Sequence, residues 1–214
     1  MNQHAAVSTV EEYCTFDDDR VYLFMAVARQ KENPQLTSST EVTFREVVKD
    51  HQDIRRKFDQ LYAWAQHYRS KSGDSLTFRL YLSVNARNTV DGFFNFQEQA
   101  NGWVRAWLKG DETAPRKFKR LSSYWKSELQ KPTASDDSRF LFDVDNATEE
   151  EMQRLIEALE AATVVLLVRE SPNGYHIVTE PFNYTTLEVD VEYELKTDGM
   201  LFVTFLTEHS ESEA

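Results

Sequence analysis

Two aspartates separated by one residue are the strongest chemical signal in this chain. Asp143 and Asp145 end the apolar segment 140–145, which reads Phe-Leu-Phe-Asp-Val-Asp. Alternate side chains of an extended strand share a face, so the two carboxylates lie side by side. Two like charges are costly to bury unless a cation or hydrogen bonds compensate them. A divalent metal ion is the natural compensating cation.

A histidine follows in a second polar motif. Segment 171–176 reads Ser-Pro-Asn-Gly-Tyr-His, and its Asn-Gly pair is a strong signal for a two-residue hairpin turn. The turn places His176 on a returning strand. We therefore expect His176 to face the same cleft as Asp143 and Asp145, across adjacent strands. A lone histidine on a strand is more often a structural hydrogen-bonding residue than a catalytic one.

The segments before these motifs are predicted to form two strands and several helices. Residues 21–28 are a continuous apolar run of strand length, and residues 76–85 alternate between apolar and polar side chains. Apolar residues spaced close to a helical period predict a helix, or a broken pair of helices, over 43–68. Similar spacing predicts helices over 90–108 and 117–129, whose aromatic side chains we expect in the core.

The segments around and after the aspartates complete the pattern. Thr148 and Glu151 form a capping box for an amphipathic helix. Residues 163–168 are predicted to form a buried strand and residues 189–206 a second hairpin. The order predicts an α+β fold with a mostly antiparallel sheet and helices packed on it, preceded by an N-terminal α/β region.

Polar side chains on the strand predicted over 76–85 are candidates for lining a cleft. Arg79, Ser83 and Asn85 share the face opposite the apolar one, and Arg87 follows them. An antiparallel strand with one solvated face gives the same alternation. The sequence alone allows both interpretations.

The composition is that of one compact domain. The chain has 214 residues, 41% of them apolar, which is enough for one substantial core. We divide it into a supporting region at 1–137, a sheet bearing the motifs at 138–206 and a tail at 207–214. Cys14 is the one cysteine, which excludes a disulfide framework. Neither a bilayer-length apolar run nor a signal-peptide pattern occurs, so we expect a cytoplasmic location without membrane contact.

Charge is unevenly distributed along the chain. The net charge is −12, yet residues 102–131 carry eight Lys and Arg against three Asp and Glu, a balance of +5. Residues 186–214 carry one Lys against eight acids, a balance of −7. Such asymmetry permits a nucleic-acid surface on an acidic protein, and a solvated helix face explains the basic segment equally well. The candidate nucleic-acid contacts are Arg116, Lys117, Lys119 and Arg120.

Taken together, the motifs resemble the catalytic core of the archaeo-eukaryotic primase superfamily, the primase-polymerases. That family carries an apolar strand ending in Asp-x-Asp, a small residue followed by x-His on a later strand, and a further apolar residue followed by Asp. Residues 143–145 match the first motif, and residues 174–176, preceded by Ser171, match the second in outline. Asp198 and Asp190 both qualify for the third. The resemblance covers about a third of the chain.

The resemblance implies a nucleotidyltransferase whose sheet is related to the RNA-recognition fold. It implies that Asp143 and Asp145, with Asp198 as the preferred third carboxylate, hold Mg²⁺ or Mn²⁺. The incoming nucleoside triphosphate would be bound by His176 and Ser171, with further contacts from Arg79, Ser83, Asn85 and Arg87. A nucleic-acid template would lie on the basic segment, and a helicase or other replication protein is a further expected partner.

Two other functions fit the same residues. A metal-dependent nuclease or phosphoesterase could use the two aspartates without specificity for a triphosphate. A noncatalytic interaction protein could retain the sheet alone, and the net charge of −12 and the lack of a zinc module or other accessory domain favour it. Short motifs fix function poorly, so the sequence leaves all three open.

Overall fold

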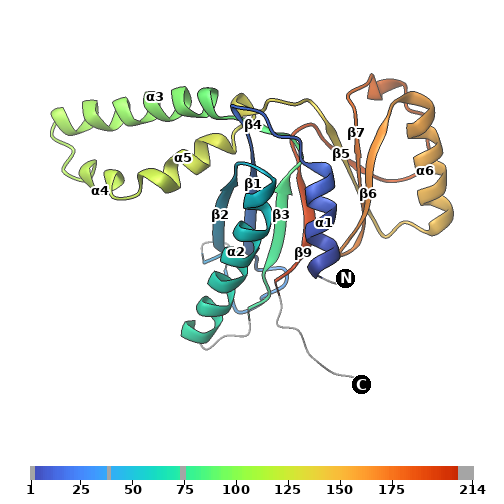
Figure 1. Cartoon of the computed structure of the whole chain (residues 1–214), viewed down its shortest axis with the longest axis horizontal. Coiled ribbons are helices and arrows are strands. Elements are labelled where there is room, and N and C mark those ends of the chain that lie inside the picture. Colours follow the sequence, from blue (N-terminus) through green and yellow to red (C-terminus); the bar gives the residue numbers. More distant parts are fainter. Residues whose placement is uncertain (1–2, 38–39, 73–75, 207–214) are drawn as a thin grey trace.

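The computed structural model describes residues 3–37, 40–72 and 76–206, which fold into two antiparallel sheets and surrounding helices (Figure 1). The strands are β1 (Arg20–Ala28), β2 (Val42–Val48), β3 (Arg79–Ser83), β4 (Arg87–Asn88), β5 (Phe140–Asp145), β6 (Val165–Ser171), β7 (Gly174–Thr179), β8 (Glu194–Lys196) and β9 (Met200–Phe205). The first sheet has the order β2-β1-β3-β9, with β4 paired to β1, and the second has the order β6-β7-β5-β8. The architecture is therefore α+β, as the sequence predicts.

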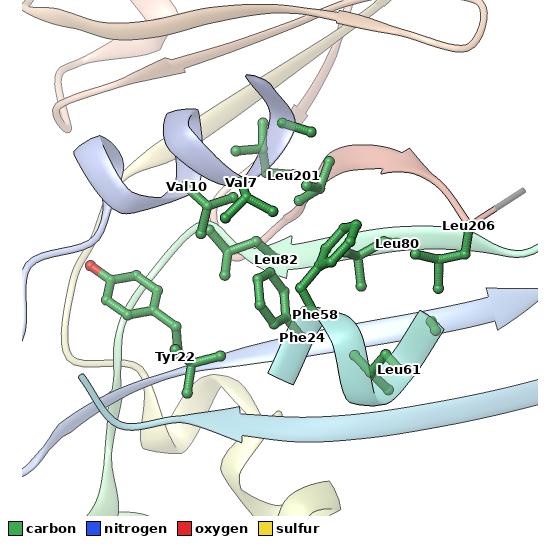
Figure 2. Close-up of a cluster of buried hydrophobic side chains, with 14 of the residues drawn as sticks. Val7, Val10, Tyr22, Phe24, Phe58, Leu61, Leu80, Leu82, Leu201 and Leu206 are labelled. Atoms are coloured by element: carbon green, nitrogen blue, oxygen red, sulfur yellow. The ribbon is translucent and has the colours of Figure 1, made fainter. Parts of the chain in front are cut away.

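One face of the first sheet packs against helices α1 (Gln3–Tyr13) and α2 (His51–Ser72). Figure 2 shows Val10 of α1 and Phe58 of α2 lying against Phe24 and Leu82 of the sheet. Because side chains alternate along a strand, the opposite face carries two separate, smaller apolar groups. Leu129 and Trp125 pack against one of them, and the other, with Val27, Tyr81 and Phe202, is the one available to a site.

The second sheet is covered on one face by helix α6 (Glu149–Ala162). The predicted capping box is confirmed, because the Thr148 hydroxyl accepts from the backbone N–H of Glu151 and the Glu151 carboxylate accepts from that of Thr148. The other face of β5 and β7 turns toward the first sheet, where Leu141 and Val178 join its core. The central strands of the second sheet therefore lie between α6 and the first sheet.

A helical arm projects from the first sheet, built from α3 (Thr89–Leu108), α4 (Pro115–Phe118) and α5 (Leu121–Leu129), and the 3-10 turn η1 (Pro132–Ala134) leads back to β5 (Figure 1). The helix over 89–108 confirms the prediction there, whereas the one predicted over 117–129 is broken after Phe118. The prediction that the aromatic residues of the arm lie in the core is wrong for most of them. The arm buries Trp103, but its outer face stays exposed.

Two predictions of secondary structure need correction. Residues 42–48 form β2 rather than the start of a helix, because their β-branched side chains suit a strand that pairs with β1. Helix α2 begins only at His51, after Asp50, whose carboxylate accepts from the backbone N–H of Asp53. The segment 163–168, predicted to be buried, instead forms the edge strand β6, on which Leu166 and Val168 are exposed.

The hairpin predicted over 189–206 is also wrong. β8 pairs with β5 in the second sheet, whereas β9 pairs with β3 in the first. Residues 197–199 therefore cross from one sheet to the other. A turn pattern cannot show this, because which strand an edge accepts depends on residues far away in the sequence. No helix in the described ranges has a stretch long and apolar enough to span a bilayer.

Candidate functional site

A cavity of about 430 Å³ lies between the two sheets, a volume within the usual range of small-molecule sites. Its apolar wall comes from the first sheet and consists of Met25, Val27, Tyr81, Met200 and Phe202. Its polar and charged lining consists of Asp143, Asp145, Ser171, Asn173, His176, Lys196 and Asp198, together with Arg29, Lys31 and Arg79. Six of the residues that the sequence singles out therefore meet in one place, namely Arg79, Asp143, Asp145, Ser171, His176 and Asp198.

Asp143 and His176 lie directly opposite each other on adjacent strands. The antiparallel register pairs Asp143 of β5 with His176 of β7, and Nε2 of the imidazole lies 3.3 Å from Oδ1 of the carboxylate. Asp145 shares the face of Asp143 and lines the same cavity. The prediction that the three side chains face one cleft is confirmed.

Gly174 allows the two strands to approach this closely. A Cβ atom at this position would overlap the backbone oxygen of Val144 on the neighbouring strand. Any larger residue would push β7 away from β5 at the point where His176 meets Asp143. The close contact between the strands therefore explains why a small residue stands two positions before the histidine. The turn before it has Pro172 and Asn173 at its corner, rather than the predicted Asn-Gly pair.

His176 is held by two contacts, one on each ring nitrogen. The backbone N–H of Phe202 donates to Nδ1 over 3.1 Å, so Nδ1 carries a lone pair. In the neutral ring the proton then lies on Nε2, which faces Asp143. The imidazole is thus fixed in one tautomer and joins β7 to β9 of the other sheet.

The carboxylate of Asp143 has a second partner, Lys196 of β8, whose Nζ lies 2.6 Å from Oδ2. The hydrogen bond from His176 and then that from Lys196 hold the pKa of Asp143 well below its usual range. Burial by itself would lower the pKa of Lys196, but hydrogen bonds to Asp143 and Glu194 outweigh it and raise that pKa. Asp143 is therefore an ionised, compensated carboxylate.

Asp198 is committed to a different partner. Arg87 makes two parallel hydrogen bonds to it, Nη1 to Oδ2 over 2.9 Å and Nη2 to Oδ1 over 2.7 Å. The Arg87 side chain is only 1% exposed, and bidentate pairs of this kind are strong. Asn85 adds a longer contact to Asp198 and also donates to the backbone oxygen of Thr197. Asp198 lines the cavity but turns its charge toward Arg87.

The donor set fits a metal ion only in part. Across the described residues, no three His, Cys, Asp or Glu side chains converge as an all-protein metal site requires. Asp143 and Asp145 nevertheless present two carboxylates to one cavity. Mg²⁺ is commonly held by one or two carboxylates together with substrate phosphates, and this pair suits that arrangement. The predicted third ligand, Asp198, does not suit it because Arg87 already neutralises its charge.

Arginine and lysine side chains gather at another part of the cavity. Arg79 pairs with Glu32 over 2.6 Å and Arg29 pairs with the same carboxylate over 3.0 Å, so the trio carries one net positive charge. Lys31 lines the cavity beside them, with its Nζ 3.0 Å from the side-chain amide of Asn173. This part of the cavity suits an anion.

Three of the predicted nucleotide contacts lie outside the cavity. Ser83 is fully buried and its hydroxyl accepts from the backbone N–H of Leu23. Asn85 is also fully buried, and its amide joins Arg139 to the loop that carries Asp198. Arg87 is occupied by Asp198. The alternation of side chains cannot show that Arg79 lines the cavity while these residues do not, because both faces of β3 are buried.

The remaining predicted residues lie apart from the cavity. Arg116 and Lys117 lie in α4, and Lys119 and Arg120 directly follow it. Figure 1 shows α4 at the outer end of the arm, away from β5 and β7. Asp190, the alternative third carboxylate, is exposed in the loop before β8 and does not line the cavity.

Sequence reasoning missed several residues of the site, namely Arg29, Lys31, Glu32, Lys196 and Glu194. None stands in a recognisable motif, and each reaches the site through the pairing of distant strands. Strand β8 pairs with β5 so that Lys196 lies opposite Leu141, two residues from Asp143. A lysine two positions before an expected aspartate ligand was the one signal available.

Comparison with known proteins gives no match: no protein-family model, curated protein or solved structure is similar to this chain.

Proposed function

We propose that this protein is a metal-dependent nucleotidyltransferase of the primase-polymerase type. The observation that carries the proposal is the direct pairing of Asp143 with His176 across adjacent strands, beside Asp145, in one cavity. Two separate sequence motifs of that family meet there in space. The order β5, α6, β6, β7 supports a relation of the second sheet to the RNA-recognition fold.

A nucleoside triphosphate suits the cavity in both charge and shape. The net positive charge of Arg29, Glu32 and Arg79, with Lys31 beside it, attracts the phosphate chain. The apolar wall across from it offers Tyr81 and other flat or flexible side chains to a base. The Nε2–H of His176 would be shared between Asp143 and a phosphate oxygen bound beside it, and Ser171 adds a hydroxyl.

Asp143 and Asp145 are the residues that would hold Mg²⁺ or Mn²⁺ in this proposal. When bound, such an ion neutralises charge on the phosphates and lowers the pKa of an attacking hydroxyl. The ammonium of Lys196 competes for Asp143 and must move aside for the ion. Asp198 has a positioning role, because its pair with Arg87 fixes the connection that directly follows Lys196.

The template is proposed to be nucleic acid bound in part by the basic residues at the outer end of the arm. Arg116, Lys119 and Arg120 are exposed there, as phosphate contacts require. Because α4 lies away from the cavity, these residues would hold a distant part of the strand rather than the reacting end. A helicase or other replication protein is the further partner that such a role implies.

The decisive experiment is a transfer assay with labelled nucleoside triphosphates, primed and unprimed templates, and Mn²⁺. We expect incorporation by the natural sequence and its loss in Asp145→Asn. Asp190→Asn is the matched control, because that carboxylate is exposed and outside the cavity. Equal activity of the two variants, or no incorporation by the unaltered protein, would refute the proposed function.

A noncatalytic role is the second candidate, and one observation favours it. Of the three carboxylates assigned to the metal by the resemblance, Asp143 and Asp198 are each paired with a cation of the chain itself. Lys196→Met distinguishes the candidates. Removing the competing ammonium should raise Mn²⁺ affinity about tenfold, the effect of roughly 1.4 kcal/mol, if Asp143 is a metal ligand. Calorimetry that finds no Mn²⁺ binding in either protein would favour the noncatalytic role.

A further inference from the structure

Helix α3 carries an apolar stripe on the outside of the arm. Three of its members are 60%, 55% and 78% exposed, namely Phe94, Trp107 and Leu108. Apolar surface gathered in this way on one face marks an interaction site more often than isolated exposed residues do. The stripe consists of Val90, Phe93, Phe94, Gln97, Ala100, Asn101, Val104, Trp107 and Leu108.

The opposite face of α3 is covered by helix α5 of the same arm. There Trp103 packs on Tyr124 of α5, with ring centroids 4.6 Å apart, and Gln99 donates to Glu128 over 2.8 Å. Gly92 lies directly against Leu129. One side of α3 is therefore filled by a helix of the same arm. The stripe is a second, uncovered surface on the other side.

The spacing within the stripe indicates a helical partner. Positions 90, 97 and 104 are seven residues apart, and so are positions 93, 100 and 107. Two rows at these offsets form the a and d positions of a heptad repeat, which pack against another helix. None of the stripe residues is charged, whereas a nucleic acid would need Lys or Arg within its contact surface.

We propose that the stripe binds the same stripe of a second copy of this chain, with the two α3 helices antiparallel. In this arrangement, the a position of one helix meets a d position of the other, so Val90 faces Trp107 and Phe93 faces Val104. Large side chains thus meet smaller ones at both ends. At the centre Gln97 meets Ala100, close to the two-fold axis. A single self-complementary surface on both copies is what a two-fold dimer requires.

The charges beside the stripe favour the antiparallel direction. Asp91, Glu98 and Arg105 are exposed and seven residues apart, so they lie along one flank of the stripe. An antiparallel pair brings the acidic beginning of one helix to the basic end of the other. A parallel pair would place this flank of the two helices on opposite sides of the dimer, so these charges would gain no attraction from each other.

Cysteine pairing tests the geometry directly. The one natural cysteine, Cys14, is buried, so introduced thiols can be followed without interference. Val90→Cys and Trp107→Cys lie at opposite ends of the helix, about 25 Å apart at 1.5 Å per residue. Under mild oxidation, a mixture of the two single variants should cross-link much faster than either variant alone. Faster cross-linking of Val90→Cys by itself would show a parallel pair and overturn the proposal.

Sedimentation of the full chain tests whether the dimer forms without cross-links. We expect dimerisation below about 100 µM, because protein interfaces of standard size reach micromolar affinity or better. Phe93→Ser with Trp107→Ser should leave a monomer. Leu121→Ser is the matched control, since it removes an exposed apolar side chain from the same arm but outside the stripe. The control variant should dimerise like the unaltered chain.

Two results would reject a second copy as the occupant. A chain that stays monomeric up to about 100 µM is the first. The second is a monomer whose Phe93→Ser/Trp107→Ser variant loses affinity for a single-stranded oligonucleotide of about 20 residues, which would assign the stripe to base stacking. Neither result depends on whether the cavity transfers nucleotides.

Discussion

The cavity and the arm differ in how their less favourable groups are compensated. In the cavity, charged groups are brought out of water, and most of them meet a partner of opposite charge, as Asp143 meets Lys196 and Asp198 meets Arg87. On the arm, apolar groups such as Phe94 and Trp107 are left in water. The cavity is complete within one chain, whereas the apolar surface of the arm gains free energy only when something covers it.

Substitutions in the cavity should affect stability, and substitutions on the arm should affect association. Changes in the buried ion pairs should unfold the protein or distort the cavity. Changes on the outer face of the arm should leave folding intact and alter only what the protein binds.

The Arg87–Asp198 pair should dominate the stability of the cavity. Arg87→Met leaves a mostly buried carboxylate without its cation, which commonly costs about 3–5 kcal/mol. Arg55→Met is the control, because the Arg55–Asp59 pair is exposed and such pairs contribute about 1 kcal/mol or less. Urea denaturation of both variants measures the difference. A loss below about 1 kcal/mol in Arg87→Met would contradict the structural role of this pair.

Gly174→Ala should be the next most damaging change. The added methyl group overlaps the backbone oxygen of Val144, and relieving such overpacking costs about 1–3 kcal/mol. The strands β5 and β7 should separate, which weakens the contact between His176 and Asp143.

A second glycine supplies the control for that variant. Gly102 lies in α3 with open space around it, so Gly102→Ala should stabilise the protein by up to about 1 kcal/mol. Thermal unfolding should show a lower stability for Gly174→Ala and a higher stability for Gly102→Ala. Equal effects would mean that Gly174 has no special steric role.

Asp143 should make the protein sensitive to acid. Its pKa is lower in the folded state than the unfolded value of about 3.9, so its contribution is fully present above that pH. The contribution is lost as pH falls toward the folded pKa. Asp143→Asn should therefore lower stability at pH 7 and flatten the decline of stability below about pH 4. Denaturation measured between pH 7 and pH 2.5 tests both effects.

Whether Asp143→Asn lowers or raises the stability depends on the partners of Asp143. Two neighbouring carboxylates without partners would repel, and removing one would stabilise the protein. Lys196 and His176 reverse this expectation because they favour the ionised form. Lys196→Met should remove part of the same pH dependence. An unchanged decline in both variants would place the acid-sensitive groups elsewhere.

The basic residues at the end of the arm should have the smallest effect on stability. Replacing Arg116, Lys117, Lys119 and Arg120 by Gln should change the free energy of unfolding by less than about 1 kcal/mol, as is usual for surface positions. Binding to any nucleic acid should weaken alike for all sequences, and its dependence on salt should become shallower. Titrations at several salt concentrations measure this slope. An unchanged slope would remove the arm from nucleic-acid binding.

Local sequence patterns determined the elements whose signals lie within a few residues. The strand over 21–28, the strand around Arg79, the capping box at Thr148 and the strand over 140–145 all appear as predicted. Asp143 and Asp145 share a face because that follows from the geometry of any strand. The alternation in β3 was visible, but it could not show that both faces would be buried.

The tertiary structure alone decided which of these groups meet. The pairing of β8 with β5 and of β9 with β3 brings Lys196 to Asp143 and the backbone of Phe202 to His176. No local pattern contains that pairing, because strand partners are chosen by packing across the whole core. The sequence of the arm likewise does not reveal what covers its apolar face. A helical apolar stripe reads identically whether its partner is the core, another helix of the chain or a second molecule, since periodicity reports only that one face avoids water.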